Sequence, residues 1–217
     1  MEQMKHPRRR LRDWWRIPRV FYYLAIRPQD ILNYCRYGAF TRKTPLELEM
    51  PWWSFGAVKY LDARLKPDSE VFEFGSGGST IFIGARVRSL TCVEDDPEWV
   101  ELVSRAGEKR RLRSISILHK PLDFRKPETF AKCDYLLSVS GKTYDVIVVD
   151  GREWSEQSRY LCFWLAENHI KTGGVIVLDD SSRYPQAKIR NRALRWKEFK
   201  GVGCCRVGVT TTCVFEY

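Results

Sequence analysis

The stretch VFEFGSGGST, residues 71–80, combines a short apolar run with a glycine-rich turn and the start of a helix. Gly75, Gly77 and Gly78 allow the backbone to approach a ligand closely. A helix that begins behind them offers unpaired N–H groups and the positive end of a dipole. Glu94 follows Gly75 by nineteen residues, at the end of the next apolar run. Because a carboxylate at that position can accept hydrogen bonds from both hydroxyls of a ribose, this spacing predicts a cradle for a nucleotide-type ligand.

Two ligands fit such a cradle, a dinucleotide and S-adenosylmethionine (SAM). A dinucleotide fingerprint needs a third glycine at position 80, where this chain has Thr80. Glu73, two residues before the first glycine, suits SAM better because SAM has no phosphates. The motif resembles the E-x-G-x-G of class I SAM methyltransferases, in which the acidic residue helps to bind the methionine part of the cofactor. With Asp123 near the adenine, the resemblance implies these cofactor-binding residues: Glu73, Gly75, Ser76, Gly77, Glu94, Asp95 and Asp123.

Three more carboxylates follow two later apolar runs. Asp150 ends the run 144–149, and Asp179 and Asp180 end the run 175–178. The carboxyl ends of parallel strands meet at one edge of a sheet, where ligands bind. Carboxylates crowded at that edge repel one another, so we expect a positive group among them. Oxygen ligands from two neighbouring loops suit Mg²⁺.

The strand-end motifs VVDG at 148–151 and VLDD at 177–180 resemble those of metal-dependent O-methyltransferases of the catechol and sugar types. The resemblance implies that Asp150, Asp179 and Asp180 hold the metal. It also implies a general base two or three residues after the first of these, at Arg152 or Glu153. Arginine does not release its proton at working pH, so Glu153 is the candidate base, and Arg152 is left to bind an anionic or hydroxyl-rich acceptor.

Residues 51–217 also resemble a broad group of small bacterial and viral SAM methyltransferases. The shared motifs are E-F-G-S-G-x-S-T, V-D-G-R and L-D-[DN]-S-x-R. The resemblance covers most of the chain and leaves out its first fifty residues.

Alternating strands and helices must position these side chains. Apolar runs predict strands at 71–74, 90–93, 114–118, 144–149 and 175–178, with two more in 201–217. Helical spacing predicts helices at 51–65, 79–85, 96–106, 127–137, 155–168 and 185–196. This order predicts an α/β, Rossmann-like, doubly wound fold: a mostly parallel seven-stranded sheet with helices on both faces.

The positive charge of the chain is concentrated at its N-terminus. The net charge is +10 over 217 residues, and residues 1–43 hold eleven Lys and Arg against three acidic residues. We therefore divide the chain into a basic, aromatic-rich arm (1–50), with helices from about Arg19 and from Pro28, and a methyltransferase domain (51–217), joined by a linker at 44–51. Three roles of the arm remain open: a helical cap packed on the domain, an interfacial helix on an anionic membrane, and nucleic-acid contact.

These features together predict a SAM-dependent O-methyltransferase, assisted by Mg²⁺, that acts on a hydroxyl of a sugar, glycan or other vicinal-hydroxyl small molecule. The alternatives are an RNA ribose methyltransferase and a non-catalytic SAM-fold module that docks through the arm. Seven cysteines without a C-x-x-C pair indicate reduced thiols and a cytoplasmic location. That location would be peripheral at a membrane surface if the arm binds lipid.

Overall fold

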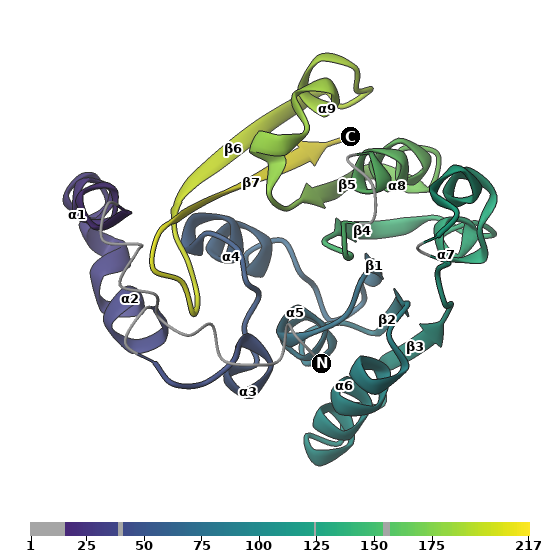
Figure 1. Cartoon of the computed structure of the whole chain (residues 1–217), viewed down its shortest axis with the longest axis horizontal. Coiled ribbons are helices and arrows are strands. Elements are labelled where there is room, and N and C mark those ends of the chain that lie inside the picture. Colours follow the sequence, from purple (N-terminus) through teal and green to yellow (C-terminus); the bar gives the residue numbers. More distant parts are fainter. Residues whose placement is uncertain (1–15, 39–40, 124, 154–156) are drawn as a thin grey trace.

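A computed structural model describes residues 16–38, 41–123, 125–153 and 157–217. In this part of the chain the central feature is a seven-stranded sheet in the order β3-β2-β1-β4-β5-β7-β6 (Figure 1). The strands are β1 (Glu70–Phe74), β2 (Ser89–Glu94), β3 (Ile115–His119), β4 (Tyr144–Val149), β5 (Ile170–Leu178), β6 (Arg195–Val202) and β7 (Val209–Glu216). The first five strands pair in parallel, and β7 pairs antiparallel with both β5 and β6. The predicted Rossmann-like sheet is confirmed.

Helices cover both faces of this sheet. The helices are α1 (Ile17–Ile26), α2 (Ile31–Tyr37), α3 (Pro45–Leu48), α4 (Phe55–Asp62), α5 (Gly78–Gly84), α6 (Pro97–Lys109), α7 (Asp134–Leu137), α8 (Ser158–Ala166) and α9 (Pro185–Ile189), with 3₁₀ turns η2 (Pro28–Asp30), η3 (Pro127–Lys132) and η4 (Ser181–Arg183).

Strand β4 shows how the two faces are built, because side chains alternate along a strand. Its Val146 and Val148 pack with residues of α4 and α5 in one buried cluster. Its Ile147 and Val149 pack with residues of α7, α8 and α9 in a second cluster on the other face. The apolar strands of the sequence are therefore buried on both sides, as expected for central parallel strands.

Local capping chemistry moves several helix boundaries away from the predicted ones. Helix α4 begins at Phe55 and not at Pro51, because the Ser54 hydroxyl accepts the Ala57 N–H at 3.4 Å. The predicted linker contains helix α3, whose N-terminus is closed by a capping box between Thr44 and Glu47. The start of α6 at Asp96 and Pro97 is as predicted, with the Asp96 carboxylate accepting two backbone N–H groups.

The predicted helix at 185–196 is wrong in its second half. Helix α9 ends at Ile189, and the chain enters β6 at Arg195. Strand β6 pairs with β7 along its whole length, from Arg195 opposite Glu216 to Val202 opposite Val209. These ladder hydrogen bonds are long-range, so local helical spacing could not reveal them.

The described part of the N-terminal arm packs against the sheet. Val20 of α1 and Tyr34 of α2 share a buried cluster with Phe55, Val202 and Cys204. The Tyr34 hydroxyl donates to the Arg206 carbonyl at 3.2 Å, and the Cys205 N–H donates to the Tyr37 carbonyl at 2.7 Å. Residues 16–38 therefore behave as a cap on the end of the sheet formed by β6 and β7. No helix within the described ranges combines the length and the hydropathy needed to cross a bilayer.

Candidate active site

The glycine turn after β1 lies against the turn after β4. Gly75 has φ +90°, and a Cβ added there would lie 2.8 Å from the Gly151 Cα. A side chain at position 75 would therefore be strained and would also collide with the neighbouring backbone. At Gly77 the nearest atom to an added Cβ is a Trp99 ring carbon 3.8 Å away, so the backbone is open to a ligand at that point.

Glu73 lies behind the glycine turn and is almost fully buried. Its carboxylate accepts hydrogen bonds from the Ser79 hydroxyl and, at 2.7 Å, from the Thr80 hydroxyl. The Thr80 oxygen in turn accepts the Gly77 N–H at 2.8 Å. Burial raises the pKa of Glu73 to about 8, although both hydroxyl donors act to lower it. This buried carboxyl fixes the shape of the turn, and it carries a negative charge only when it is ionised, above a pH of about 8.

Glu94 ends β2 beside the same turn. One of its oxygens accepts the Ser76 hydroxyl at 2.8 Å, and the other accepts the N–H groups of Asp95 and Asp96 at 3.0 and 3.2 Å. The Trp99 indole N–H donates to the Ser76 carbonyl at 2.7 Å and holds the loop from its other side. Burial, with the nearby Asp95 charge, raises the pKa of Glu94 to about 7. The structure thus brings Glu73, Ser76, Gly77 and Glu94 together.

A buried hydroxyl supports the view that this cradle takes a ligand. Tyr135 of α7 is fully buried, and its hydroxyl has no hydrogen-bond partner among the described residues. This oxygen lies only 2.1 Å from the position of a Cβ added at Gly151, the residue that contacts Gly75. Buried hydroxyls normally have a partner, so this unpaired one, at the contact between Gly75 and Gly151, fits a polar group bound there. The carboxyl groups of Glu73 and Glu94 together with this hydroxyl suit SAM, which carries a sulfonium, an amino group and ribose hydroxyls.

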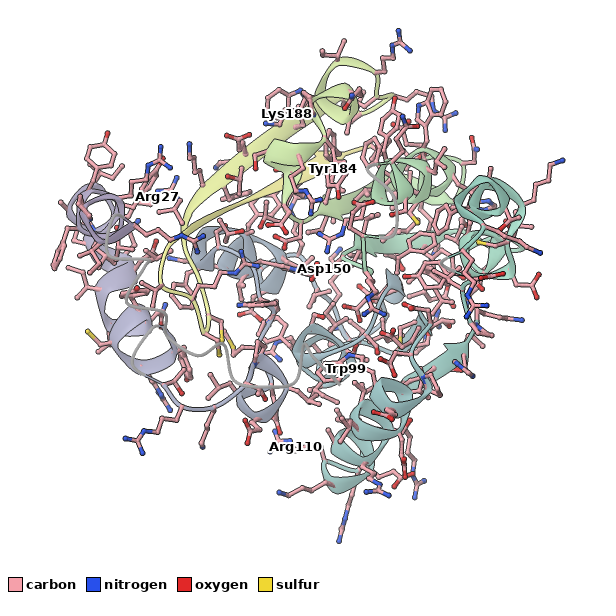
Figure 2. The ribbon with its side chains drawn as sticks, viewed as in Figure 1. Arg27, Trp99, Arg110, Asp150, Tyr184 and Lys188 are labelled. Carbon is pink, nitrogen blue, oxygen red and sulfur yellow. The ribbon has the colours of Figure 1, made fainter. Side chains whose placement is uncertain are left out.

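Asp150, at the end of β4, is held by two side chains that the motif analysis did not single out. Its Oδ2 accepts the indole N–H of the fully buried Trp53 at 2.8 Å. Its Oδ1 pairs with the Arg159 guanidinium at 3.2 Å. Burial raises the pKa of Asp150, while Arg159 and the Trp53 hydrogen bond act against the shift. Figure 2 shows Asp150 near the middle of the molecule.

Arg159 of α8 connects the two strand ends. Its Nε donates to the Gly151 carbonyl at 2.7 Å, and its Nη1 donates to the Asp179 carbonyl at 3.3 Å. Its Nη1 also lies 3.9 Å from an Asp180 carboxylate oxygen. The side chain is 11% exposed. Arg159 is therefore the buried cation among these carboxylates.

The remaining two carboxylates are also satisfied by protein groups. The buried Asp179 accepts the Thr212 hydroxyl at 2.7 Å, and burial raises the pKa of Asp179 to about 8. Asp180 accepts the Thr210 hydroxyl at 3.3 Å and lies 3.7 Å from the Arg206 guanidinium. Arg159, Arg206 and one proton on Asp179 balance the three negative charges.

This arrangement does not fit the predicted magnesium site. Asp150, Asp179 and Asp180 lie close together, but their oxygens face Trp53, Thr212 and two guanidinium groups. In the described parts of the chain no group of three His, Cys, Asp or Glu side chains converges as metal ligands. The expected positive group is present, and it is arginine.

The other predicted site residues have different surroundings. Glu153 accepts the backbone N–H of Ser158 at 3.1 Å and the Ser158 hydroxyl, so one of its oxygens is used at the start of α8. Arg152 lies 3.8 Å from the Asp95 carboxylate. Asp123 is exposed and accepts the Arg125 N–H at 3.0 Å within its own turn. Arg152 and Asp95 thus lie at the cradle, whereas Asp123 makes no described contact with it, and its adenine contact stays a prediction.

Two cavities open near these elements. One of 430 Å³ lies between α1, η4 and the β6–β7 hairpin and is lined by Arg19, Tyr22, Tyr23, Ser182, Lys200, Val209 and Thr211. It adjoins the Asp179–Asp180 strand end and contains two cationic side chains. The other, of 610 Å³, lies between α7, α8 and the α9–β6 connection, away from the glycine turn.

A mostly parallel sheet in the order β3-β2-β1-β4-β5-β7-β6, with a glycine turn after β1 and a carboxylate at the end of β2, is typical of class I SAM methyltransferases. Residues 72–181, just over half of the chain, match the family described as a methyltransferase domain, and the chain belongs to this family. No curated protein sequence matches it significantly.

Solved structures show the same fold at low sequence identity. An rRNA methylase from Streptococcus thermophilus has a TM-score of 0.57 at 9% identity, covering 81% of this chain and 98% of its own. A putative methyltransferase from Streptococcus mutans, in complex with SAH, has 0.56 at 7% identity, covering 82% and 100%. A putative O-methyltransferase from Klebsiella pneumoniae has 0.55 at 12% identity, covering 92% and 96%. The predicted enzyme class and its cofactor, SAM, are confirmed at this level.

Glu94→Ala should weaken SAM binding by about 2–4 kcal/mol, because two charge-assisted hydrogen bonds to the ribose are lost. The affinity of the wild-type protein for SAH should also fall as pH is lowered through 7, because the pKa of Glu94 is about 7 and only its ionised form accepts both hydroxyls. Titration calorimetry at pH 6 and pH 8 measures both effects. Glu101→Ala, which removes an exposed carboxylate on α6, is the matched control and should leave the SAM affinity unchanged. An unchanged affinity in Glu94→Ala would remove Glu94 from the cofactor site.

Proposed function

We propose that this methyltransferase transfers the methyl group of SAM to a hydroxyl of a sugar, glycan or other vicinal-hydroxyl small molecule, with Asp150 as the base. The observation that supports this most directly is the contact between Gly75 and Gly151. It brings the turn that carries Asp150 against the turn that cradles the cofactor. A carboxylate next to the methyl donor is suitably located to meet an acceptor hydroxyl.

Methyl transfer is a one-step displacement at carbon, in which SAM, when bound, supplies the methyl group. The protein must align the acceptor oxygen opposite the leaving sulfur and remove its proton. Trp53 and Arg159 each hold one oxygen of Asp150, which fixes the direction of the carboxylate. Burial raises the pKa of Asp150, and a higher pKa makes a stronger base at neutral pH. Asp150 is therefore held in one orientation and is, through burial, more basic than an exposed aspartate.

We assign to Arg159 the electrostatic role that the strand-end motifs predicted for Mg²⁺. Its guanidinium is paired with Asp150 and reaches towards Asp180. Replacement of one or both guanidinium groups by a dication would require the Trp53 and Thr212 hydrogen bonds to rearrange. No step of the proposed mechanism therefore passes through a metal.

The 430 Å³ cavity supports an acceptor that carries negative charge as well as hydroxyls. Its lining includes Arg19 and Lys200, the aromatic rings of Tyr22 and Tyr23, and two hydroxyl side chains. Aromatic rings pack well on sugar rings, and cationic side chains pair with carboxylate or phosphate groups. RNA ribose is the second candidate acceptor, favoured by the charge of +8 in residues 1–43.

The test is product analysis by mass spectrometry after incubation with SAM and separate pools of glycans, sugar phosphates and RNAs. We expect a mass increase of one methyl group on a hydroxyl-bearing small acceptor. Parallel reactions with EDTA and with added Mg²⁺ should proceed at the same rate, because the charges around Asp150 are already balanced by arginine. Methylation of RNA alone would favour the second candidate, and activity abolished by EDTA and restored by Mg²⁺ would restore the metal hypothesis.

A further inference from the structure

Helix α1 carries many apolar side chains that the rest of the protein leaves exposed. Its sequence IPRVFYYLAI has one charged residue, Arg19, yet only Val20 is buried. A helix that is hydrophobic all round is normally enclosed by its surroundings. A second surface is therefore needed to cover the side of α1 that faces away from the sheet.

Large exposed apolar side chains are concentrated on this part of the chain. Of the twelve in the described residues, six lie between positions 17 and 32: Ile17, Phe21, Tyr22, Ile26, Ile31 and Leu32. Phe21 is 68% exposed and Leu32 is 78% exposed. Tyr22 also lines the 430 Å³ cavity, so we call the other five residues the outer face. Helices α1 and α2 lie together at one end of the molecule, at the left of Figure 1, so the outer face is well separated from α6 and α7.

The charge around the outer face has one sign. Arg19 and Arg36 are exposed beside it. Asp30 is the only acidic residue in 16–38, and it is buried, where the positive charges of Arg27 and Lys59 act on it. No described carboxylate of this segment therefore reaches solvent, and residues 1–43 together carry +8.

We propose that the outer face binds the surface of an anionic lipid bilayer and holds this methyltransferase at a membrane. Aliphatic and aromatic side chains enter the boundary between headgroups and acyl chains, while the arginines pair with anionic headgroups. RNA fits the outer face less well, because Ile17, Ile26 and Leu32 offer neither stacking nor hydrogen bonds to bases. A second copy of the chain fits less well too, because two such basic surfaces would repel each other.

Vesicle co-sedimentation with the full-length protein tests this proposal. The wild-type protein should bind vesicles of phosphatidylglycerol and phosphatidylcholine, bind pure phosphatidylcholine at least tenfold more weakly, and lose affinity as salt is raised. The double variant Phe21→Glu, Leu32→Glu should lose at least tenfold in affinity for the anionic vesicles, because both the apolar contact and the charge match are removed. Both side chains are exposed, so thermal unfolding of the variant should match that of the wild-type protein.

Ile189→Glu, Leu194→Glu is the matched control, since these side chains are 79% and 85% exposed on a different part of the surface. It should bind the anionic vesicles as the wild-type protein does. Equal losses in both double variants, or no binding of the wild-type protein to anionic vesicles, would overturn the proposal. It would also be overturned if light scattering showed a wild-type dimer that the Phe21→Glu, Leu32→Glu variant loses, or if this variant lost RNA binding and kept vesicle binding.

Discussion

Arg159→Leu should lower the free energy of unfolding by about 3–5 kcal/mol, the usual cost of removing one partner from a buried ion pair. Without the guanidinium, Asp150 loses its cation at 3.2 Å, and Asp180 keeps only Arg206. Urea unfolding of the wild-type protein and the variant at pH 7.5 measures the difference. The defect should shrink as pH is lowered, because burial raises the pKa of Asp150 and a protonated Asp150 no longer needs a counter-charge. This pH dependence separates a lost charge from a lost packing contact.

Arg105→Leu provides the control for this prediction. Arg105 pairs with Glu101 on the exposed surface of α6, and a surface pair contributes less than about 1 kcal/mol. Millimolar Mg²⁺ should not raise the melting temperature of the wild-type protein. If Arg159→Leu unfolds like the wild-type protein, or if Mg²⁺ raises the melting temperature of the wild-type protein, then Arg159 is not the group that balances these carboxylates.

Asp150→Asn should lower methyl transfer by about 10²–10⁴-fold, the usual range for a lost general base. An asparagine oxygen can still accept the Trp53 N–H, so the turn should keep its position. The amide has no basic oxygen with which to take the acceptor proton. Rates are measured by single-turnover methyl transfer, and SAH affinity is measured by calorimetry and should stay within a few-fold of the wild-type value.

Glu153→Gln distinguishes this base from the one predicted from the sequence. Glu153 uses one oxygen on the Ser158 N–H and hydroxyl at the start of α8, so its replacement should slow turnover much less than Asp150→Asn. A larger effect of Glu153→Gln would return the role of base to Glu153. Loss of SAH binding in Asp150→Asn would mean that Asp150 supports the cofactor and not the acceptor.

The sequence alone was sufficient for the central strands and for most of the helices between them, and it predicted where a cofactor cradle would lie. A continuous apolar run such as 144–149 must be buried on both sides. Such a run therefore indicates a central strand from the sequence alone. The spacing from Gly75 to Glu94 is local to one βαβ unit, and in the structure Glu94 accepts the hydroxyl of Ser76, the residue after Gly75. Helix N-termini with a side-chain cap, such as Asp96, were also predictable from the sequence.

What surrounds Asp150 was decided by tertiary structure. Trp53 comes from the segment before α4, Arg159 from the first turn of α8, Arg206 from the β6–β7 turn and Thr212 from β7. No spacing rule links these four residues to the carboxylates, and Arg206 and Thr212 meet them only when the antiparallel β6–β7 hairpin joins the sheet. The three strand-end acids predicted a positive group among them, but a metal ion and a buried arginine both supply positive charge. Only the folded chain, by bringing Arg159 to within 3.2 Å of Asp150, distinguishes the two.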